Sequence, residues 1–573
     1  MFASGRVEGA SRTGGIVGMF SGTGIVLENA RWDAATTGQA NATGLDAGGT
    51  VTGTAAVGNA FSYTSYASLG TWSQISNSNV WVAKDAAGKA QWIMIEGQTR
   101  PFLASEYSLA VSNSHQLQLM SYDLNASYNI VRDIDAKATG TSGSGMWGVG
   151  GFSPIGNGAQ FMGSLDGQGH VISNLTVGNN TSFSGLFGFI GVTGTVRNVG
   201  LDNAVVGGFI QSGALAAVNY GTIDNVFANA KVSAQGFGNG VGGLVGQNSG
   251  TISNSYSSGT VTTNGPIIGQ VGGLVGYNIG TINKSYSTSK INTIFPYPGN
   301  GALVGMNSGV VNDSFAASTD AAGNPIPGVP LQLVGSNGGT VSATSGMKTY
   351  AELSQLSTFK DAGWDIDNAG GTGAMWRIYE GAGGPLLRGF LKQITVSLAD
   401  KVYDGQISGG VGYIASRPGA ELGGSISYTA NSKNAGTYTV ADGSLTVNGG
   451  LYSNQQGYDI IYADGLSLNV LKKGVAIDVT ADNKTYDGTS NAVVRGQAGS
   501  DVIAGDNLGA IGVGNFSDKN AGAGKTVTVG GITLTGADAG NYFIASVTSP
   551  TTTATITAKT LTCLLYTSPS PRD

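Results

Sequence analysis

Apolar residues recur at a nearly constant spacing through the middle of this chain, at Leu215, Leu244, Leu274, Leu303 and Leu333. An asparagine lies four positions after each leucine, at Asn219, Asn248, Asn278, Asn307 and Asn337. A glycine follows each asparagine by two, at Gly221, Gly250, Gly280, Gly309 and Gly339. An aromatic residue falls twelve positions after each of the first four leucines, at Phe227, Tyr256, Tyr286 and Phe315. A fixed period between about 20 and 50 residues predicts a solenoid, propeller or array.

Each repeat has the pattern of one coil of a parallel β-helix. In the clearest copy, residues 241–265, β-prone pieces such as 250–252 and 260–262 are separated by Gly, Ser and Asn and are too short for helices. In such a coil of about 29–30 residues, equivalent residues stack about 4.8 Å apart. We therefore expect a leucine ladder inside, an aromatic ladder, a ladder of asparagine amides, and glycines at tight corners.

The direction of the aromatic ladder stays open on sequence alone. Ile252 and Tyr256 are an even number of residues apart, so strand alternation would place them on the same face. The position equivalent to Ser255 in the preceding repeat, however, holds the apolar residue Val226. A bend between Ile252 and Tyr256 would reconcile the two observations.

Two further patterns repeat outside the array. Residues 92–103 and 376–387 share Trp, Ile, Glu-Gly, Pro and Leu, which predicts a module that closes each array; the alternative is a sugar cleft lined by Trp and Glu. Residues 401–405 and 484–488 share Lys-x-Tyr-Asp-Gly, and Asn-Ala-Gly recurs at 434–436 and 520–522. These copies predict two small all-β domains, β-sandwich or β-grasp-like, in which Tyr-Asp-Gly forms a turn.

The repeats divide the chain into predicted segments. They are 1–50, the end of a preceding array; 51–117, a closing or linker module; 118–345, the solenoid; 346–392, a second closing module; 393–472 and 473–559, the two related β domains; and 560–573, a tail that is not native. Gly14 to Gly18 nearly reproduces the Gly-Gly-Leu-Val-Gly core, and an uncapped first coil would expose its face, so we expect the natural start to lie upstream. The stretch from Cys563 onward interrupts the pattern and resembles translated adapter sequence.

Composition narrows the class of protein. Charged residues make up 11% of the 573 residues, against about 25% in ordinary globular domains, and 96 residues are glycine. With a net charge of -6 and no basic run, nucleic acid is not expected as a partner. The sequence contains no run of about 18 apolar residues, so no transmembrane segment is expected. The single cysteine, Cys563, excludes a disulfide framework and suits a protein exported unfolded.

The repeat motifs resemble known families. The pattern of residues 242–256 looks like the GLUG repeat, and the Tyr-Asp-Gly domains resemble YDG/MBG-type repeat domains. Their combination is similar to filamentous-haemagglutinin-like adhesins exported by two-partner secretion. That resemblance implies a bacterial cell-surface or secreted fibre and an outer-membrane transporter as the export partner. It supplies no catalytic residue for this chain.

Residues with chemistry are sparse. His115 and His170 are the two histidines and lie far apart in the sequence, and the metallopeptidase pattern of two helical histidines beside a glutamate is missing. Between 213 and 345 the acids are Asp224, Asp313 and Asp320, which occupy different repeat slots, so no paired-carboxylate mechanism is expected there. Asp133, Asp135 and Asp166 lie in the first coils and could approach one another, although solvated turn residues explain them better.

The leading hypothesis is a non-enzymatic adhesin that binds glycans or proteins of host or neighbouring cells through stacked polar ladders and exposed aromatics. The alternatives are a carbohydrate-active β-helix lyase or hydrolase and a passive spacer. We expect no catalytic residue, no cofactor and no metal site, and an extracellular or cell-surface location.

Overall fold

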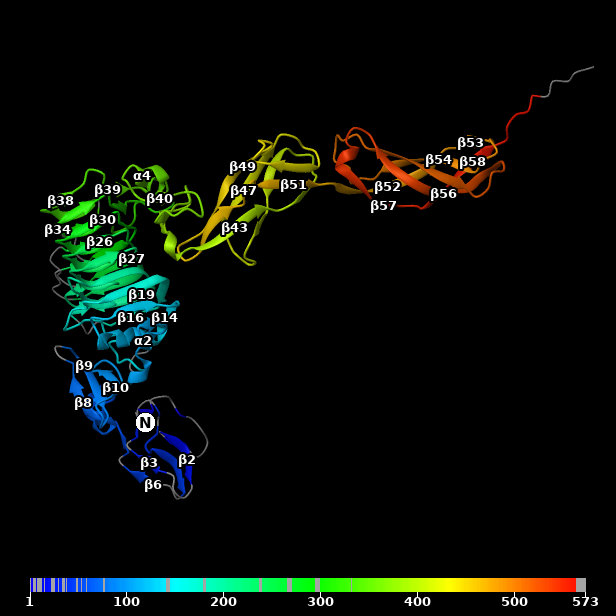
Figure 1. The fold of residues 1–573 in the computed structure, drawn as a ribbon. Helices are drawn as coiled ribbons and strands as arrows, with labels where there is room; N and C mark the ends of the chain where they lie inside the picture. The colour runs from blue at the N-terminus through cyan, green and yellow to red at the C-terminus, as the bar shows by residue number, and fades with distance from the viewer. Residues whose placement is uncertain are drawn as a thin grey trace, which may run out of the picture. The chain divides into compact units, whose positions relative to one another are not determined.

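The computed structural model describes the chain in short stretches between residues 2 and 57, and then over 59–75, 78–140, 145–178, 182–235, 240–264, 270–293, 299–330 and 332–562. The chain forms two compact units, residues 1–392 with 454–459, and residues 393–453 with 460–573. Strands supply most of the regular structure in both (Figure 1), so the all-β prediction is confirmed. The segment 563–573, with Cys563, lies outside the described residues.

The first unit is dominated by a parallel β-solenoid with three walls. One wall stacks β17 (Phe183–Ser184), β20 (Gln211–Ser212), β24 (Gly240–Gly242), β28 (Val271–Gly272) and β33 (Asn300–Gly301). The second stacks β18 (Phe187–Ile190), β21 (Ala216–Asn219), β25 (Val245–Asn248), β29 (Val275–Asn278), β34 (Val304–Asn307) and β37 (Val334–Asn337). The third wall contains β12 (Ala110–Val111), β13 (Ser127–Ile130), β14 (Ile134–Asp135), β15 (Ser164–Ser173), β16 (Thr176–Val177), β19 (Thr195–Gly208), β22 (Thr222–Asp224), β23 (Phe227–Ala234), β26 (Thr251–Ser253), β27 (Tyr256–Thr263), β30 (Thr281–Asn283), β31 (Tyr286–Ser287), β32 (Lys290–Thr293), β35 (Val310–Asn312), β36 (Phe315–Ala317), β38 (Thr340–Val341) and β39 (Gly346–Lys348).

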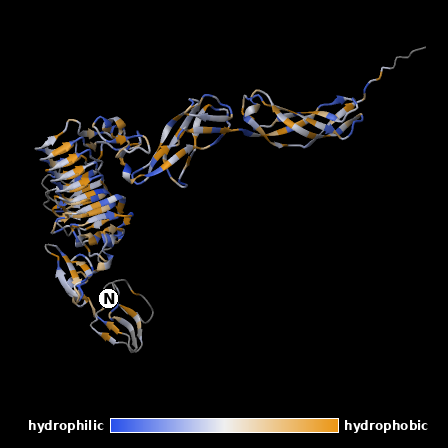
Figure 2. Ribbon diagram, viewed as in Figure 1, coloured by the Kyte–Doolittle hydropathy of each residue, from blue (hydrophilic) through white to orange (hydrophobic). Residues whose placement is uncertain are grey.

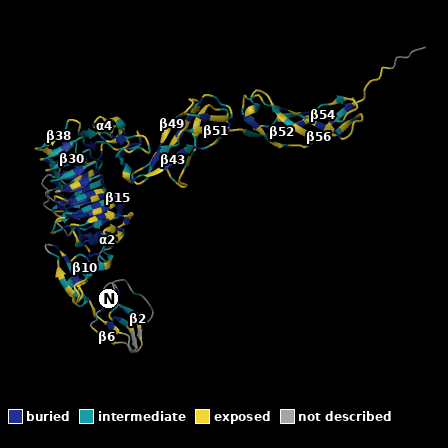
Figure 3. Cartoon of the chain, viewed as in Figure 1, coloured by how far each residue is buried: buried dark blue, intermediate teal, exposed yellow. Residues whose placement is uncertain are grey.

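The coils stack in the register that the repeat predicts. Val245 pairs with Val275 and Asn248 with Asn278, so each coil places its residues directly beside their repeat equivalents. The leucine column, Leu215, Leu244, Leu274 and Leu303, is fully buried inside the solenoid together with Ile223, Ile252, Ile282 and Val311. Hydrophobic residues accordingly form bands along the stacked strands (Figure 2), and the same strands are largely buried (Figure 3).

The asparagines form the predicted amide ladder. The Nδ2 of Asn219 donates to Oδ1 of Asn248, and the same 2.8 Å hydrogen bond continues through Asn278, Asn307 and Asn337. Each rung also serves the backbone, because Asn248 Nδ2 lies 3.3 Å from the carbonyl oxygens of Gly250 and Thr281. The first four asparagines are completely buried, so this chain of bonds satisfies polar groups that would otherwise destabilise the core.

A left-handed residue supplies the bend that the sequence left open. Asn254 has φ 46°, between Ile252, which lies in the solenoid core, and Tyr256, which lies in a second apolar cluster outside it. The turn reverses the side-chain alternation, so Ser255 and Val226 point into the core and the aromatic column points outward. The equivalent positions in other coils also have positive φ: Asn198, Asn225, Lys284 and Asp313.

The two Trp–Leu segments fold as the same hairpin. Trp92 in β10 (Ala90–Ile95) pairs with Leu103 in β11 (Phe102–Leu103), as Trp376 in β41 (Trp376–Arg377) pairs with Leu387 in β42 (Leu386–Leu387). Elsewhere in these modules lie η1 (Tyr63–Leu69), β8 (Thr71–Gln74), β9 (Val80–Lys84), η2 (Ala104–Glu106), α2 (Ser114–Leu119), η3 (Met120–Tyr122), α3 (Tyr350–Leu353), α4 (Leu356–Lys360), β40 (Ile366–Asp367) and η5 (Arg388–Phe390).

The glutamate of each hairpin caps a short helix. Glu96 accepts a 2.8 Å hydrogen bond from the backbone N–H of Tyr63, the first residue of η1. Glu380 accepts a 3.0 Å bond from the N–H of Leu356, the first residue of α4. Because these carboxylates hold helix ends and Trp376 is fully buried, the alternative of an open Trp–Glu sugar cleft is wrong for the second copy.

Short strands before residue 57 also pair in parallel. β2 (Val17–Ser21) pairs with β5 (Thr43–Ala47), β3 (Val26–Glu28) with β6 (Thr50–Thr52), and β4 (Arg31–Trp32) with β1 (Phe2–Ala3) and β7 (Ala55–Ala56). Val17 lies beside Thr43 and Val26 beside Thr50, so two successive strands find their parallel partners at similar intervals. Stacked coils produce this arrangement.

The second unit contains two β modules of related topology. The first is built from β43 (Lys392–Leu398), β44 (Lys401–Val402), β45 (Ser408–Val411), β46 (Tyr413–Ala415), β47 (Gly423–Ala430), β48 (Gly436–Thr439), β49 (Leu445–Tyr452), β50 (Tyr458–Tyr462) and β51 (Ser467–Leu471). The second is built from β52 (Lys473–Ala481), β53 (Lys484–Thr485), β54 (Asn491–Ala498), β55 (Gly509–Phe516), β56 (Gly522–Thr535), β57 (Tyr542–Val547) and β58 (Thr551–Thr557).

We expect Asn278→Leu to destabilise the first unit by about 1–3 kcal/mol, because it removes a rung between Asn248 and Asn307 and leaves buried amide groups without partners. Urea unfolding followed by tryptophan fluorescence measures this unit alone, since all seven tryptophans lie in it. Asn337→Leu is the matched control, because Asn337 is the exposed end of the ladder. Equal unfolding midpoints for the two variants would contradict a stabilising role of the ladder.

Candidate binding surface

The outward aromatic column is covered by residues 346–392. Tyr256 stacks on Tyr286 with ring centroids 4.8 Å apart, and Phe227 stacks on Tyr256 at 5.5 Å. Trp376 lies against Tyr286 at 5.9 Å and Tyr256 at 6.3 Å. Trp364, Phe359 and Phe390 extend the cover from Phe315 to Phe227. We call residues 346–392 the clasp, because they run back along the column and close it from the side.

A buried ion cluster fastens the clasp. Asp459, which belongs to the first unit, pairs with Arg377 (Oδ1 to Nε, 3.1 Å) and Arg388 (Oδ2 to Nη1, 2.6 Å). Gln455 adds two hydrogen bonds to the backbone of Leu387 and accepts a bond from the Tyr256 hydroxyl. The phenol of Tyr256 is so deeply buried that its pKa is raised well above the usual value. The expectation of binding through exposed aromatics is therefore wrong for the column Phe227, Tyr256, Tyr286 and Phe315.

The outer face of the second wall has a different character. Its outward column runs Val218, Gln247, Tyr277, Met306 and Ser336, in direct register from coil to coil. The middle three side chains are partly exposed, and the neighbouring turn column adds exposed Tyr220 and Ile279. Inward positions repeat the same residue types, whereas this column changes in every coil. We call Gln247, Tyr277, Met306, Tyr220 and Ile279 the open face.

The acids and histidines of the first coils form separate pairs rather than one cluster. Asp133 lies 3.1 Å from Nδ1 of His170, Asp135 accepts from Asn174, and Asp166 pairs with Arg197. His115 lies in α2 and bonds Glu106 at 2.7 Å. The pKa of Asp135 is lowered by its hydrogen bonds from the Asn174 side chain and the Lys137 backbone, so it is anionic at neutral pH. Each acid has its own local partners, as expected for turn residues.

The acids of the later coils have separate local partners. Asp224 accepts a hydrogen bond from Asn254, the backbone carbonyl of Asp313 accepts one from the Trp364 indole, and Asp320 caps the turn at Ala322. Within the described residues no group of three His, Cys, Asp or Glu side chains could hold a metal ion. Among the sequence candidates, the structure brings Asp133 and His170 together and leaves the remaining acids in separate contacts.

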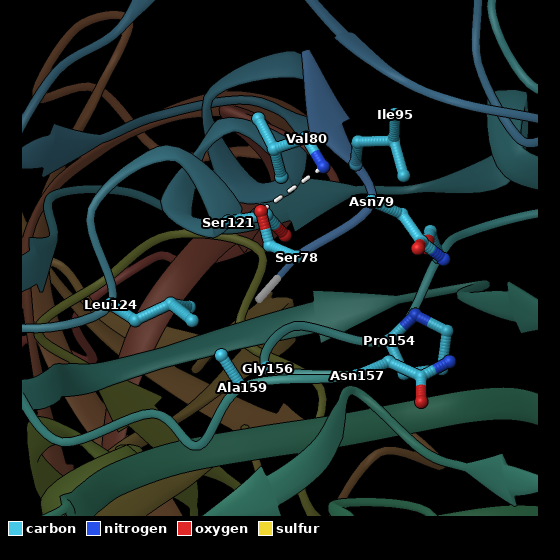
Figure 4. A pocket seen from close by; sticks show the side chains of 11 residues that line it. Ser78, Asn79, Val80, Ile95, Ser121, Leu124, Pro154, Gly156, Asn157 and Ala159 are labelled. Atoms are coloured by element: carbon cyan, nitrogen blue, oxygen red, sulfur yellow. Dashed lines mark hydrogen bonds between the residues drawn. The ribbon is translucent and has the colours of Figure 1, made fainter. Parts of the chain in front are cut away.

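The cavities are small or shallow. One of about 20 Å³ lies between β9 and the loop 153–159, beside Ser78, Ser121 and Pro154 (Figure 4), and has room for about one water molecule. An open depression of about 570 Å³ lies between the turn at Asp320 and the start of α3, and Asp320 is the one carboxylate of its lining. A space of about 220 Å³ beside His170 contains Asp133 and Lys392. None of the three presents two facing carboxylates.

The Tyr-Asp-Gly segments are turns, as predicted. Asp404 accepts from the N–H of Gln406 and from Lys401 Nζ, and Asp487 accepts in the same way from Thr489 and Lys484. The following glycines, Gly405 and Gly488, have φ of 75° and 81°. The pKa of Asp487 is lowered by the Lys484 ammonium and the Thr489 hydrogen bonds.

The two Tyr-Asp-Gly modules meet at a buried carboxylate. Asp506 of the second module accepts hydrogen bonds from Tyr403 (2.8 Å) and Tyr542 (2.6 Å) and pairs with Lys433 of the first at 2.7 Å. Asn541 accepts a bond from the Ala435 backbone and donates to Asn434. Burial alone would raise the pKa of Asp506, but the bonds from Lys433, Tyr542 and Tyr403 together hold it below its usual value. Burial and the bond to Asp506 raise the pKa of Tyr542 to about 12.

In-register coils with an internal amide ladder, followed by turn-capped β modules joined end to end, define a modular β-repeat protein. Comparison with known families agrees. Residues 472–554 match the YDG domain, and residues 237–262 match the GLUG motif.

Two curated proteins are similar to parts of this chain. Halomucin of Haloquadratum walsbyi is 35% identical over 249 residues, which is 42% of this chain and 3% of that protein. A Gly-rich membrane protein assigned in Evansella cellulosilytica is 40% identical over 107 residues, 17% of this chain and 12% of that protein. The chain therefore spans a small fraction of either relative's length.

Two solved structures share limited similarity. An IgA1 protease has 16% identity and a TM-score of 0.28, covering 40% of this chain and 17% of that one. A candidate immunoglobulin A1 protease from Bacteroides ovatus has 17% identity and a TM-score of 0.32, covering 49% of this chain and 92% of that one. Among the described residues, no helix is long and apolar enough to cross a membrane.

We expect Trp376→Ala to destabilise the first unit by about 3–5 kcal/mol, because it empties the centre of the clasp. Hydrogen exchange in β27 and β31 should rise, and an apolar fluorescent dye should bind the uncovered aromatic column. Tyr277→Ala on the open face is the control and should change neither. A variant with unaltered exchange in those strands would show that the clasp does not protect them.

The contact between the two modules should depend on pH. Because the pKa of Asp506 is depressed in the folded protein, its contribution is present above the ordinary aspartate value of about 4 and is lost as pH falls through the folded value. Because that of Tyr542 is raised, its contribution is present below about 10 and is lost as pH rises toward about 12.

The exchange rate of the Ala435 amide, relative to that of the unfolded chain at the same pH, measures the acid and alkaline limits of this contact. Asp506→Asn should speed this exchange at neutral pH and remove the acid limit, whereas the exposed Asp501→Asn should do neither. If the contact between the modules were still lost at low pH in Asp506→Asn, a group other than Asp506 would be responsible for that loss.

Proposed function

We propose that this chain is a segment of a large cell-surface or secreted repeat protein that serves as a stalk and an adhesive surface. The observation that carries the proposal is the division of labour in the solenoid. Its inward columns repeat in order to stack coils, whereas the open face changes from coil to coil. This column offers partly exposed Gln, Tyr and Met side chains for contact with a ligand.

Stacking lengthens the solenoid while constraining only a few residues of each coil. Each coil adds about 4.8 Å along the axis and needs only its own apolar residues, one asparagine and a few glycines. The matched families and the relatives, one named as a mucin and one as a Gly-rich membrane protein, support a role at the cell surface. Export through an outer-membrane transporter of the two-partner-secretion kind, implied by the resemblance to filamentous-haemagglutinin-like adhesins, belongs to the same proposal.

The open face supports binding of glycans or proteins on host or neighbouring cells. Tyr277 and Tyr220 offer aromatic surface, and Gln247 offers a hydrogen-bonding amide that is already oriented by Gln211 and Ser249. Aromatic side chains beside oriented amides suit both sugar rings and polypeptide. Low charge means that such binding would depend weakly on salt.

Binding of the labelled full chain to mucin, to a glycan array and to cells tests the proposal. Tyr277→Ala and Tyr220→Ala should each weaken binding about fivefold or more, the effect of removing an interface anchor. Tyr452→Ala, an exposed tyrosine of the second unit, is the matched control. Absence of binding to all three supports would leave a spacer, and release of reducing sugar ends from the same glycans would indicate an enzyme instead.

A further inference from the structure

The two Tyr-Asp-Gly modules have the same backbone pairings at the end that carries the Tyr-Asp-Gly tyrosine, which we call the far end. In the first module, the second module covers this end. In the first module, Tyr403 donates its backbone N–H to Leu471 at 2.8 Å, and Lys401 and Gly436 both pair with Val470. In the second, Tyr486 donates to Thr557 at 2.8 Å, and Lys484 and Gly522 both pair with Ile556.

This backbone match places the equivalent side chains in equivalent positions. Lys433, Asn434 and Ala435 immediately precede Gly436, and Lys519, Asn520 and Ala521 immediately precede Gly522. The far end of the second module is therefore composed of Tyr486, Lys519, Asn520 and Ala521. We call these four residues the distal socket.

The two ends differ in what covers them. Tyr403 is 1% exposed because the second module covers it, and Lys433 pairs with Asp506. Tyr486 is partly exposed, and Lys519, Asn520 and Ala521 are exposed. No carboxylate of the described residues pairs with Lys519. The distal socket thus has a donor hydroxyl, an ammonium, an amide and a backbone N–H, all of which are bonded in the first copy.

We propose that the distal socket is a docking surface for a further module of the same type joined in series. The occupant must present the group that Asp506, Asn541 and Tyr542 form on the near end of the second module. This group supplies a buried carboxylate that accepts from the lysine ammonium and from two tyrosine hydroxyls. It also supplies an amide oxygen that accepts from the backbone N–H. A second copy of this chain does not offer that group, because its own Asp506 is already engaged with Tyr403 and Lys433.

The sequence after β58 resembles that of the first junction. Leu471 is followed after one residue by Lys473, and Val475 is fully buried as an inward residue of β52. Thr557 is followed after one residue by Lys559, and Leu561 occupies the place of Val475 but is 87% exposed. Residues 559–562 thus repeat the start of the module's first strand and extend the pattern into the segment expected as a tail.

The test is a full chain in which residues from 559 onward are replaced by a second copy of residues 473–559. This replacement removes Cys563, so the chain contains no other thiol. A cysteine pair, Ala521→Cys with Asn541→Cys in the added copy, is treated with a short bis-thiol cross-linker. The reference is Ala435→Cys with Asn541→Cys at the existing junction, where the Ala435 nitrogen lies 2.8 Å from Asn541 Oδ1.

We expect the new pair to cross-link within one molecule at a rate comparable with the reference pair. Lys519→Ala should lower the new rate about tenfold, the factor expected for one charge-assisted hydrogen bond, without altering the reference rate. Lys525→Ala is the matched control, because Lys525 pairs with Asp518 inside its own module. Asp506→Ala in the added copy should repeat the effect of Lys519→Ala.

Three outcomes would overturn the proposal: a new pair that reacts no faster than free thiols of the unfolded chain, a rate that Lys519→Ala leaves unchanged, or cross-links that form between molecules. Circular dichroism of the extended chain, compared with the parent, establishes that the added copy is folded. Because this proposal concerns module docking, it can fail while the proposed adhesive function stands.

Discussion

In-register stacking of coils is the constraint on which the first unit depends. A parallel coil can bond its backbone only to equivalent residues of its neighbours, so an insertion of one residue would move a whole column to the wrong face. The ladder from Asn219 to Asn337 fixes this register with side chains as well as backbone, because each amide donates to the amide oxygen of the equivalent asparagine in the next coil. The interior thus combines apolar packing with hydrogen bonds that require each coil to be in register with the next. The nearly constant repeat length follows from this need for register.

The aromatic column Phe227, Tyr256, Tyr286 and Phe315 lies outside the solenoid. Leucine, isoleucine and valine fill the interior of these coils, whereas the first coils hold Phe161 and Phe187 inside. The left-handed residue at Asn254 and its equivalents turns the aromatics outward, where they would form an exposed apolar strip. The clasp removes that strip from water with Trp364 and Trp376, and buried Asp459 orients Arg377 and Arg388 over it. The open face is thereby left for the proposed adhesion.

Sequence alone was enough for the features that depend on period. The columns of leucine, asparagine and glycine predicted the coil, its register and the amide ladder, because stacking converts a sequence interval directly into a contact. The orientation of Tyr256 was not predictable from alternation, since it depends on one dihedral angle. A usable signal was nevertheless present: four of the five coils have a residue type that tolerates positive φ at this position, namely Asn198, Asn225, Asn254 and Asp313, and the fifth has Lys284. The clasp and the contact at Asp506 join segments far apart in sequence, and no period encodes them.

The two halves of the molecule solve the same problem at different scales. A solenoid coil is incomplete until the next coil bonds its backbone, and a Tyr-Asp-Gly module is incomplete until the next module supplies a carboxylate to its tyrosine and lysine. In the solenoid the link is neutral, short and continuous, so its strength is insensitive to pH. Between modules the link centres on the buried Asp506 carboxylate, so it weakens when Asp506 is protonated or its tyrosines are ionised. A contact that depends on pH between modules and one that does not within the array follow from that difference in chemistry.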